Sequence, residues 1–335
     1  MLTFSGELLA MLVTILVAAE LFTNALEQLG DRLKISEGVT GSLFAAIATA
    51  LPETTVPLLA ILAGTSNVRL NEEVGVGSIL GAPLMLSTLS TCLMGLAALR
   101  RRGLKGLISP EKTGLVRDLN FFLFAFGIAA AAMWAPQSRH LIRIGLSLAL
   151  VITYCVYILL TLRASDSLVQ DGHGTIAEEG LFLSRAGLPT TLATILVQLA
   201  LGLVLLVGGA EGFIHGVEGV SGLLHVSALL VSLLIIPIAT ELPEKVNSIL
   251  WVRRGKDTLA FGNITGAMVF QGTLLPAIGI LLTPWEPREE VLAGVLVTLA
   301  GAAWVRINIR PRGLRIWMLL INGMLYLIYL VITLT

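Results

Sequence analysis

The chain has 335 residues, of which 56% are hydrophobic and 13% are charged. A soluble globular domain carries about 25% charged residues, so this composition excludes an ordinary soluble protein and indicates an integral membrane protein. The 22 basic and 22 acidic residues leave no formal net charge, which gives no support for binding nucleic acid. We therefore expect the lipid bilayer to surround most of the chain.

Ten apolar segments are long enough to cross a bilayer, which takes about 20 residues of helix. In chain order they cover residues 8–29, 38–63, 74–99, 119–133, 141–162, 188–214, 226–251, 258–282, 291–305 and 314–334. Trp134, Trp251, Trp285 and Trp317 lie near proposed ends, where an aromatic belt would place them. The sequence thus predicts an all-α membrane protein with ten transmembrane helices.

The basic residues give the chain an orientation. With the N-terminus outside, 17 of the 22 Lys and Arg residues fall in cytoplasmic connections, four fall in external ones, and Lys245 lies within a span. Cytoplasmic loops carry an excess of Lys and Arg, so both termini are predicted to lie outside. The first apolar run lacks a basic leader and a clear cleavage site, and we expect a retained span. A compact multi-pass chain of this kind fits a bacterial inner (plasma) membrane.

The longest polar stretch, residues 164–186, divides five spans from five. We interpret it as a solvated cytoplasmic linker rather than a regulatory ion-binding loop, because flexible polar linkers are common. It is too short to be a separate domain. The expected organisation is a five-helix repeat at 1–163, the linker at 164–186, and a second five-helix repeat at 187–335.

The two halves share a motif at an offset of 191 residues. The first copy reads Ala48-Thr49-Ala50-Leu51-Pro52-Glu53, and the second reads Ala239-Thr240-Glu241-Leu242-Pro243-Glu244. Gly75, Gly77 and Gly81 follow the first copy, and Gly262 and Gly266 follow the second, which should let helices approach closely. The motif regions thus extend over 48–83 and 239–268. Because five spans is an odd number, the second copy enters the membrane from the opposite side. This is an inverted-topology repeat, in which secondary transporters bind substrate near the midplane.

The repeated motif places a carboxylate beside a proline inside an apolar segment, and both residues are costly there. A threonine four residues before each glutamate lies on the same helix face, and each proline leaves one backbone carbonyl without its helical donor. Such hard oxygen ligands suit Ca²⁺ or Na⁺. The candidate cation ligands are Glu53, Glu244, Thr49, Thr240, Ser78, Asn263, Ala48 and Ala239, with Glu53 and Glu244 as the metal-binding carboxylates.

Other charged residues lie within the predicted spans. Glu241 and Lys245 are four residues apart on one helix, so they form either a structural ion pair or a functional one. In the functional alternative, Lys245 is a tethered cation that replaces a bound Na⁺. Glu20 and Glu211 are matched carboxylates that suit either a polar contact between helices or a role in gating or proton relay. Glu27 lies nearer a span end and is expected to be solvated.

At these motifs the chain resembles the cation/Ca²⁺ exchanger superfamily, which includes the Na⁺/Ca²⁺ exchangers. That family carries two inverted repeats, each reading roughly G-T-S-L-P-E and later G-N/D-x-x-G-S-N. In this sequence the family's serine is replaced by Ala50 in the first copy and by Glu241 in the second. The resemblance implies that Glu53 and Glu244 are the central cation ligands. It also implies that Ser78 and Asn263 occupy the Asn/Asp ligand positions.

The residues and the resemblance predict a secondary active antiporter that exchanges Ca²⁺ for Na⁺, or for H⁺, by alternating access. Inorganic cations are then its transported partners, and no cofactor is expected. One alternative is an H⁺- or K⁺-coupled exchanger of another cation, and another is a passive cation channel. An enzyme is not expected, because the sequence holds no H-E-x-x-H or G-x-S-x-G motif.

Overall fold

The computed structural model describes residues 2–46, 68–177, 179–224 and 241–334, which are mostly helical. The first half contains α1 (Leu2–Leu33), α2 (Glu37–Val39), η1 (Thr40–Ala45), α5 (Val68–Met85), η2 (Leu86–Ser90), α6 (Thr91–Arg102), β1 (Leu107–Ile108), α7 (Lys112–Ala131), η3 (Ala132–Trp134) and α8 (His140–Leu168). The second half contains η4 (Val169–His173), α9 (Phe182–Arg185), α10 (Leu192–Leu224), α13 (Leu242–Arg254), α14 (Asp257–Leu282), α15 (Glu289–Ile307), β2 (Leu314–Arg315) and α16 (Ile316–Leu334).

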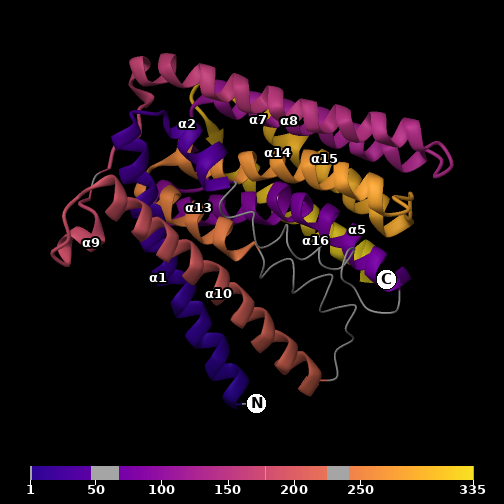
Figure 1. The fold of residues 1–335 in the computed structure, drawn as a ribbon, viewed down its shortest axis with the longest axis horizontal. Helices are drawn as coiled ribbons and strands as arrows, with labels where there is room; N and C mark the ends of the chain where they lie inside the picture. Colours follow the sequence, from indigo (N-terminus) through magenta and orange to yellow (C-terminus); the bar gives the residue numbers. More distant parts are fainter. Residues whose placement is uncertain (1, 47–67, 178, 225–240, 335) are drawn as a thin grey trace.

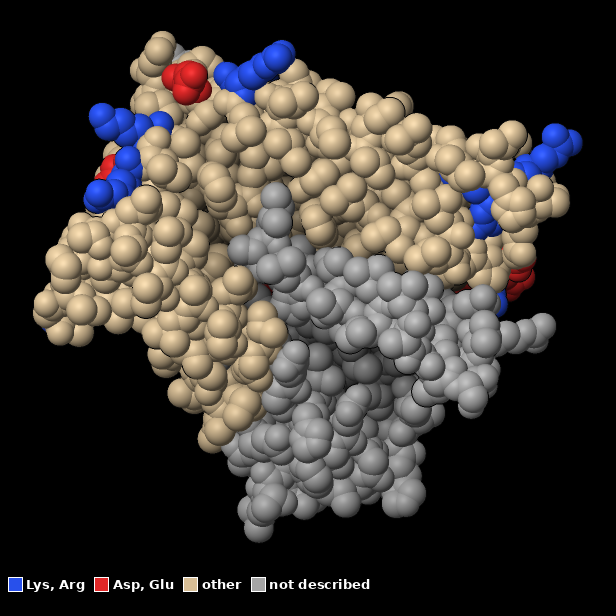
Figure 2. Space-filling model, in the orientation of Figure 1, with Lys and Arg blue, Asp and Glu red and all other residues tan. Residues whose placement is uncertain are grey.

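Among the described residues, seven helices are long and apolar enough to cross a membrane. Each of the ten predicted apolar segments is helical over most of its described residues, although α10 begins at Leu192 rather than at 188 and residues 314–315 form strand β2. The polar stretch differs from a plain linker, because α8 continues to Leu168 and a π-helical turn, η4, follows it. Figure 2 shows the charged side chains of one face gathered toward its margins, with an uncharged surface between them. An apolar band between two charged ends is what a bilayer requires.

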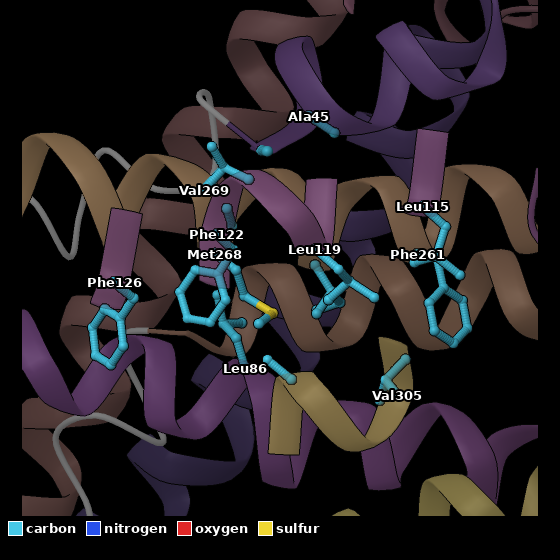
Figure 3. Close-up of a cluster of buried hydrophobic side chains, with 14 of the residues drawn as sticks. Ala45, Leu86, Leu115, Leu119, Phe122, Phe126, Phe261, Met268, Val269 and Val305 are labelled. Atoms are coloured by element: carbon cyan, nitrogen blue, oxygen red, sulfur yellow. The ribbon is translucent and has the colours of Figure 1, made fainter. Parts of the chain in front are cut away.

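Helix α14 forms the centre of the bundle. Nearly all of its length is buried, and it packs against α5, α7, α8, α13 and η1. Figure 3 shows part of this core, where Phe122 and Phe126 of α7 lie near Met268 of α14. The two phenylalanine rings are stacked with their centroids 5.2 Å apart. A helix that is apolar on all sides is buried, and α14 fits that rule.

Helices α1 and α10 lie side by side over much of their length (Figure 1). A Cβ added at Gly202 of α10 would lie 2.9 Å from the backbone nitrogen of Phe22, so the two backbones touch. Gln198 Nε2 donates to Asn24 Oδ1 at 2.8 Å and to the carbonyl of Leu21 at 3.0 Å. Small residues and side-chain amides are the usual means of joining helices in lipid.

Several connections meet at one end of the bundle. Strands β1 and β2 pair antiparallel, which joins the α6–α7 connection to the α15–α16 connection. Ser36, after α1, forms an isolated bridge with Gly174, after α8. Arg102 of α6 donates two hydrogen bonds to Asp257 of α14, at 2.7 and 2.9 Å. The connections after the first, third, fifth, seventh and ninth predicted spans therefore share this end.

At the opposite end, α7, α8 and the connection after η3 contact the connection after α14. Gln137 Nε2 donates to Glu286 Oε1 at 2.9 Å. Trp285 Nε1 donates to the carbonyl of Ala129 at 2.9 Å, and Arg143 donates to the carbonyl of Pro284 at 2.9 Å. Trp285 and Trp251 are 1% and 0% exposed, so the expectation that they form an aromatic belt is wrong. Each indole N–H has a buried acceptor, which accounts for its burial.

Candidate functional site

The structure describes three of the eight predicted cation ligands, which are Glu244, Asn263 and Ser78. Five predicted ligands lie outside the described residues, and so does the side chain of Glu211. These five are Glu53, Thr49, Ala48, Thr240 and Ala239. The predicted residues that are described are Glu244, Glu241, Lys245, Asn263, Ser78 and Glu20. The first four come from α13 and α14, which are joined by a short turn.

Helix α13 begins at the second copy of the motif. Glu241 is its N-cap, with φ −94° and ψ 11°, and Pro243 stands in the first turn. Proline is well tolerated there because the first-turn N–H groups have no acceptor within the helix. The sequence predicts that Pro243 lies within a helix and interrupts its hydrogen bonds. Instead, α13 begins at the motif, and Pro243 lies in its first turn. Glu244 lies in the first turn, where the helix dipole favours a carboxylate.

Asn263 of α14 fixes the backbone and side chains around Glu244. Its Nδ2 donates to the carbonyl oxygen of Glu244 at 3.1 Å and to Ser248 Oγ at 3.0 Å. Both amide hydrogens are therefore committed, which sets the orientation of the amide. Asn263 is fully buried, and its Oδ1 has no hydrogen-bond donor among the described residues.

Further buried oxygens accompany Asn263 Oδ1. Glu241 Oε1 and the amide of Asn247 also have no hydrogen-bond partner in the described part of the chain. Glu241, Glu244 and Asn247 are all 0% exposed. Leaving Asn263 Oδ1, Glu241 Oε1 and the Asn247 amide buried and unsatisfied is costly, so these atoms call for a partner. Carboxylate and amide oxygens around a buried glutamate are a suitable donor set for a hard cation.

Lys245 is the positive charge in this region. Its Nζ lies 3.2 Å from Glu241 Oε2, and the two side chains are 2% and 0% exposed. The structure thus contains the pair that the four-residue spacing predicts. Ser78 lies on α5, half-buried, and α5 packs against the helix that carries Asn263.

Glu20 does not join the cluster around Glu244. Its carboxylate pairs with Arg254, at the C-terminal end of α13. Glu27, two turns further along α1, accepts from Lys256 Nζ at 2.8 Å and from Trp251 Nε1 at 2.9 Å. Glu27 is 4% exposed, so the expectation that it is solvated is wrong, because it is paired. The two glutamates join α1 to the turn between α13 and α14.

A second buried carboxylate, Asp118 of α7, escaped the sequence analysis. Asp118 Oδ2 accepts from Ser42 Oγ at 2.8 Å and from Thr265 Oγ1 at 2.7 Å, and Oδ1 accepts from Tyr157 OH at 3.1 Å. The carboxylate is 1% exposed and joins η1, α7, α8 and α14. Because Thr265 is two residues from Asn263, this cluster anchors the helix that supports Glu244.

The glycines of the second copy make the close approach that their spacing predicts. A Cβ added at Gly262 would lie 3.1 Å from the backbone nitrogen of Ser42, and one added at Gly266 would lie 2.5 Å from Ser42 Cα. Helix α14 and η1 therefore touch backbone to backbone. In the first copy, Gly77 and Gly81 have no described atom within 4 Å of an added Cβ.

The sequence analysis also missed Asn247 and Ser248. Both lie on α13 at three and four residues after Glu244, which places them on its face of the helix. This spacing was a usable signal, because polar residues repeating with the helical period inside an apolar segment mark a face that avoids lipid. No comparable signal pointed to Asp118, because its partners are distant in the sequence.

Comparison with known proteins identifies the family of the chain. The chain matches the family described as sodium/calcium exchanger protein over residues 6–163 and 194–335. It is 25% identical to the inner membrane protein YrbG of Escherichia coli over 291 residues, covering 85% of this chain and 82% of that protein. A stretch of 96 residues is 38% identical to CaxA of Alkalimonas amylolytica, but it covers only 30% of that protein.

The fold is also similar to a solved structure. The sodium-calcium exchanger NCX_Mj, in crystals soaked with zero Na⁺ and Ca²⁺, superimposes with a TM-score of 0.75 at 20% identity. The match covers 99% of each chain. The family match over most of the sequence and this similarity of fold agree with each other. The chain belongs to the sodium/calcium exchanger protein family, whose members are cation exchangers of the membrane.

Proposed function

We propose that this protein is a secondary active antiporter that exchanges Ca²⁺ for Na⁺, or for H⁺, around Glu53 and Glu244. The observation that carries the proposal is the cluster of fully buried oxygens around Glu244. Asn263 Oδ1 and Glu241 Oε1 have no donor among the described residues. A cation would satisfy these atoms, and membership of an exchanger family makes that cation the cargo.

Two carboxylates account for exchange at one site. Glu53 and Glu244 together neutralise one divalent cation or two monovalent cations, but not both sets at once. Competition for the same oxygens therefore couples the two fluxes when the site opens to one side at a time. Thr49, Thr240, Ser78 and the carbonyls of Ala48 and Ala239 complete the proposed ligand set.

We further propose ten membrane spans with both termini outside, in a bacterial inner membrane. The contacts between connections support this topology. Connections that follow odd-numbered spans contact one another, as in the pairing of β1 with β2. Connections that follow even-numbered spans also contact one another, as in the hydrogen bond from Gln137 Nε2 to Glu286 Oε1 at 2.9 Å. An added or missing span would mix the two sets.

The packing also supports an inverted repeat of residues 1–163 and 187–335, joined by 164–186. Exchanging the two repeats maps the contact of α7 with α14 onto the contact of α15 with α5, and both contacts are made. It likewise maps the contact of α8 with α14 onto the contact of α16 with α6. A pseudo-two-fold arrangement produces such paired contacts.

Transport by purified protein in liposomes tests the proposal. Uptake of Ca²⁺ would be measured while Na⁺, K⁺ and H⁺ gradients are imposed in turn. We expect one of the Na⁺ or H⁺ gradients to drive Ca²⁺ against its own gradient. Glu53→Gln and Glu244→Gln should abolish this uptake, whereas Glu289→Gln, at an exposed position on α15, should retain it.

Three outcomes would contradict the proposal in different ways. Flux that only runs down the Ca²⁺ gradient indicates a passive channel. Uptake driven by K⁺, or of a cation other than Ca²⁺, indicates an exchanger with other ions. Normal uptake by both glutamine variants shows that the site lies elsewhere.

A further inference from the structure

The pair formed by Glu241 and Lys245 is an unusual component for the centre of a membrane protein. Its two side chains are 0% and 2% exposed, and its charged atoms lie 3.2 Å apart. Burying two charges is expensive, and a buried pair is often no more stable than apolar residues of similar size. A contribution to folding alone therefore does not account for it.

The position of the pair connects it to the candidate site. Lys245 directly follows Glu244, and Glu241 caps the same helix turn. Glu241 lies within electrostatic range of both Lys245 and Glu244. One oxygen of Glu241 accepts from Lys245, and the other, Oε1, has no donor in the described part of the chain. The pair is therefore part of the same buried polar cluster.

The charges of Glu241 and Lys245 cancel within the candidate site. Glu241 stands where the first copy of the motif has the uncharged Ala50, so it adds a carboxylate to the site. Lys245 contributes an ammonium group that offsets this carboxylate. The pair as a unit carries no net charge, and the site keeps the two negative charges of Glu53 and Glu244.

We propose that Lys245 is a built-in monovalent cation of the transport site, held by Glu241 in the place of a mobile ion. This inference rests on the proposed function, because it concerns the ions bound at the proposed site. It follows that removing the ammonium alone leaves Glu241 able to bind one mobile monovalent cation. Removing both charges abolishes that extra site.

The number of Na⁺ ions bound by the folded protein provides the test. Thermal unfolding of purified protein would be followed while NaCl replaces choline chloride at constant ionic strength. The buffer would be mildly alkaline, because a low proton concentration leaves Na⁺ as the cation that can bind Glu241. Ligands that bind only the folded state raise its stability with concentration, by an amount that reports the ions bound.

Lys245→Met preserves most of the side-chain volume and removes the charge. We expect its stability to depend on Na⁺ more steeply than that of the wild type. The additional effect is about a tenfold fall in the unfolding constant for each tenfold rise in saturating Na⁺. Lys245→Arg keeps the positive charge and should show the wild-type dependence.

A double variant keeps the test decisive if Lys245→Met folds poorly. Glu241→Gln combined with Lys245→Met removes both charges, so it should fold and show no additional Na⁺ dependence. If poor folding of Lys245→Met is relieved by high NaCl but not by choline chloride, the inference is supported. If Lys245→Met and the double variant respond to Na⁺ like the wild type, the pair is only structural and the inference is wrong.

The outcome is distinguishable from failure of the proposed function. A wild type that shows no cation-driven Ca²⁺ uptake overturns the antiporter. The additional Na⁺ dependence of Lys245→Met is a difference between variants and requires no transport. A wild type that exchanges ions while Lys245→Met gains no Na⁺ dependence overturns only the inference about Lys245.

Discussion

Gly266→Ala tests how tightly α14 is held against η1. A Cβ at residue 266 would lie 2.5 Å from Ser42 Cα, whereas ordinary van der Waals contacts begin at 3.4 Å. The two backbones must therefore separate by about 1 Å, because neither atom belongs to a flexible side chain. Ser42 and Thr265 lie on the two sides of this contact and both donate to Asp118.

The expected cost follows from three contributions. Overpacking of this kind costs about 1–3 kcal/mol. Lengthening one hydrogen bond to the Asp118 carboxylate costs about another 1.5–3 kcal/mol. The higher helix propensity of alanine returns about 1 kcal/mol. We expect Gly266→Ala to lower the free energy of unfolding by about 1.5–5 kcal/mol.

Thermal unfolding in detergent, followed by tryptophan fluorescence, measures this change. Gly127→Ala in α7 is the matched control, because an added Cβ there has no described atom within 4 Å. The control should melt at or slightly above the wild-type temperature, since only the propensity gain applies. If Gly266→Ala unfolds at the same temperature as the control, α14 and η1 are not packed as closely as the structure indicates.

Three further changes test other parts of the structure by the same measurement. Asp118→Ala should cost about 2–4 kcal/mol because buried hydroxyls lose their carboxylate acceptor, and Asp118→Asn should cost less because one oxygen remains. Lys256→Met should cost about 3–5 kcal/mol by leaving Glu27 without its closest cation, and Glu27→Gln in the same chain should recover part of the loss. Burial raises the pKa of Glu37 above its ordinary value, against an opposing effect of Lys256. The protonated form is thus favoured by folding, so stability should fall as the pH rises through that pKa. Glu37→Gln should remove this fall, which begins near the ordinary pKa of 4.5, and an unchanged pH profile would refute the assignment.

The elements were predictable because the bilayer imposes a simple pattern on sequence. Apolar length located most of the helices. The glycine spacing at 262 and 266 correctly indicated a close helix contact, because few other reasons place small residues one turn apart in a span. The four-residue spacing likewise predicted the pair of Glu241 and Lys245. These signals are local, so no tertiary information was needed.

The polar clusters were less predictable because their members are distant in the sequence. Asp118 lies just before the apolar run at 119–133 and looks like part of a solvated connection. Its burial depends on hydroxyls from η1, α8 and α14, which only the fold assembles. Trp251 was expected at the lipid interface for a similar reason. Its indole is buried because Glu27, on another helix, accepts its N–H.

The arrangement of α14 links these clusters to the candidate site. Within one turn, Asn263 supports Glu244 on one side, and Thr265 binds Asp118 on another. Gly262 and Gly266 set how closely this turn approaches η1. The position of Asn263 Oδ1 in the helix bundle is therefore fixed by contacts that involve no cation. Substitutions at Gly266 or Asp118 should then weaken cation binding through the position of Asn263, although neither residue is a proposed ligand. A variant that loses stability at these positions but keeps its full affinity for Ca²⁺ would show that the amide oxygen is not held by this turn.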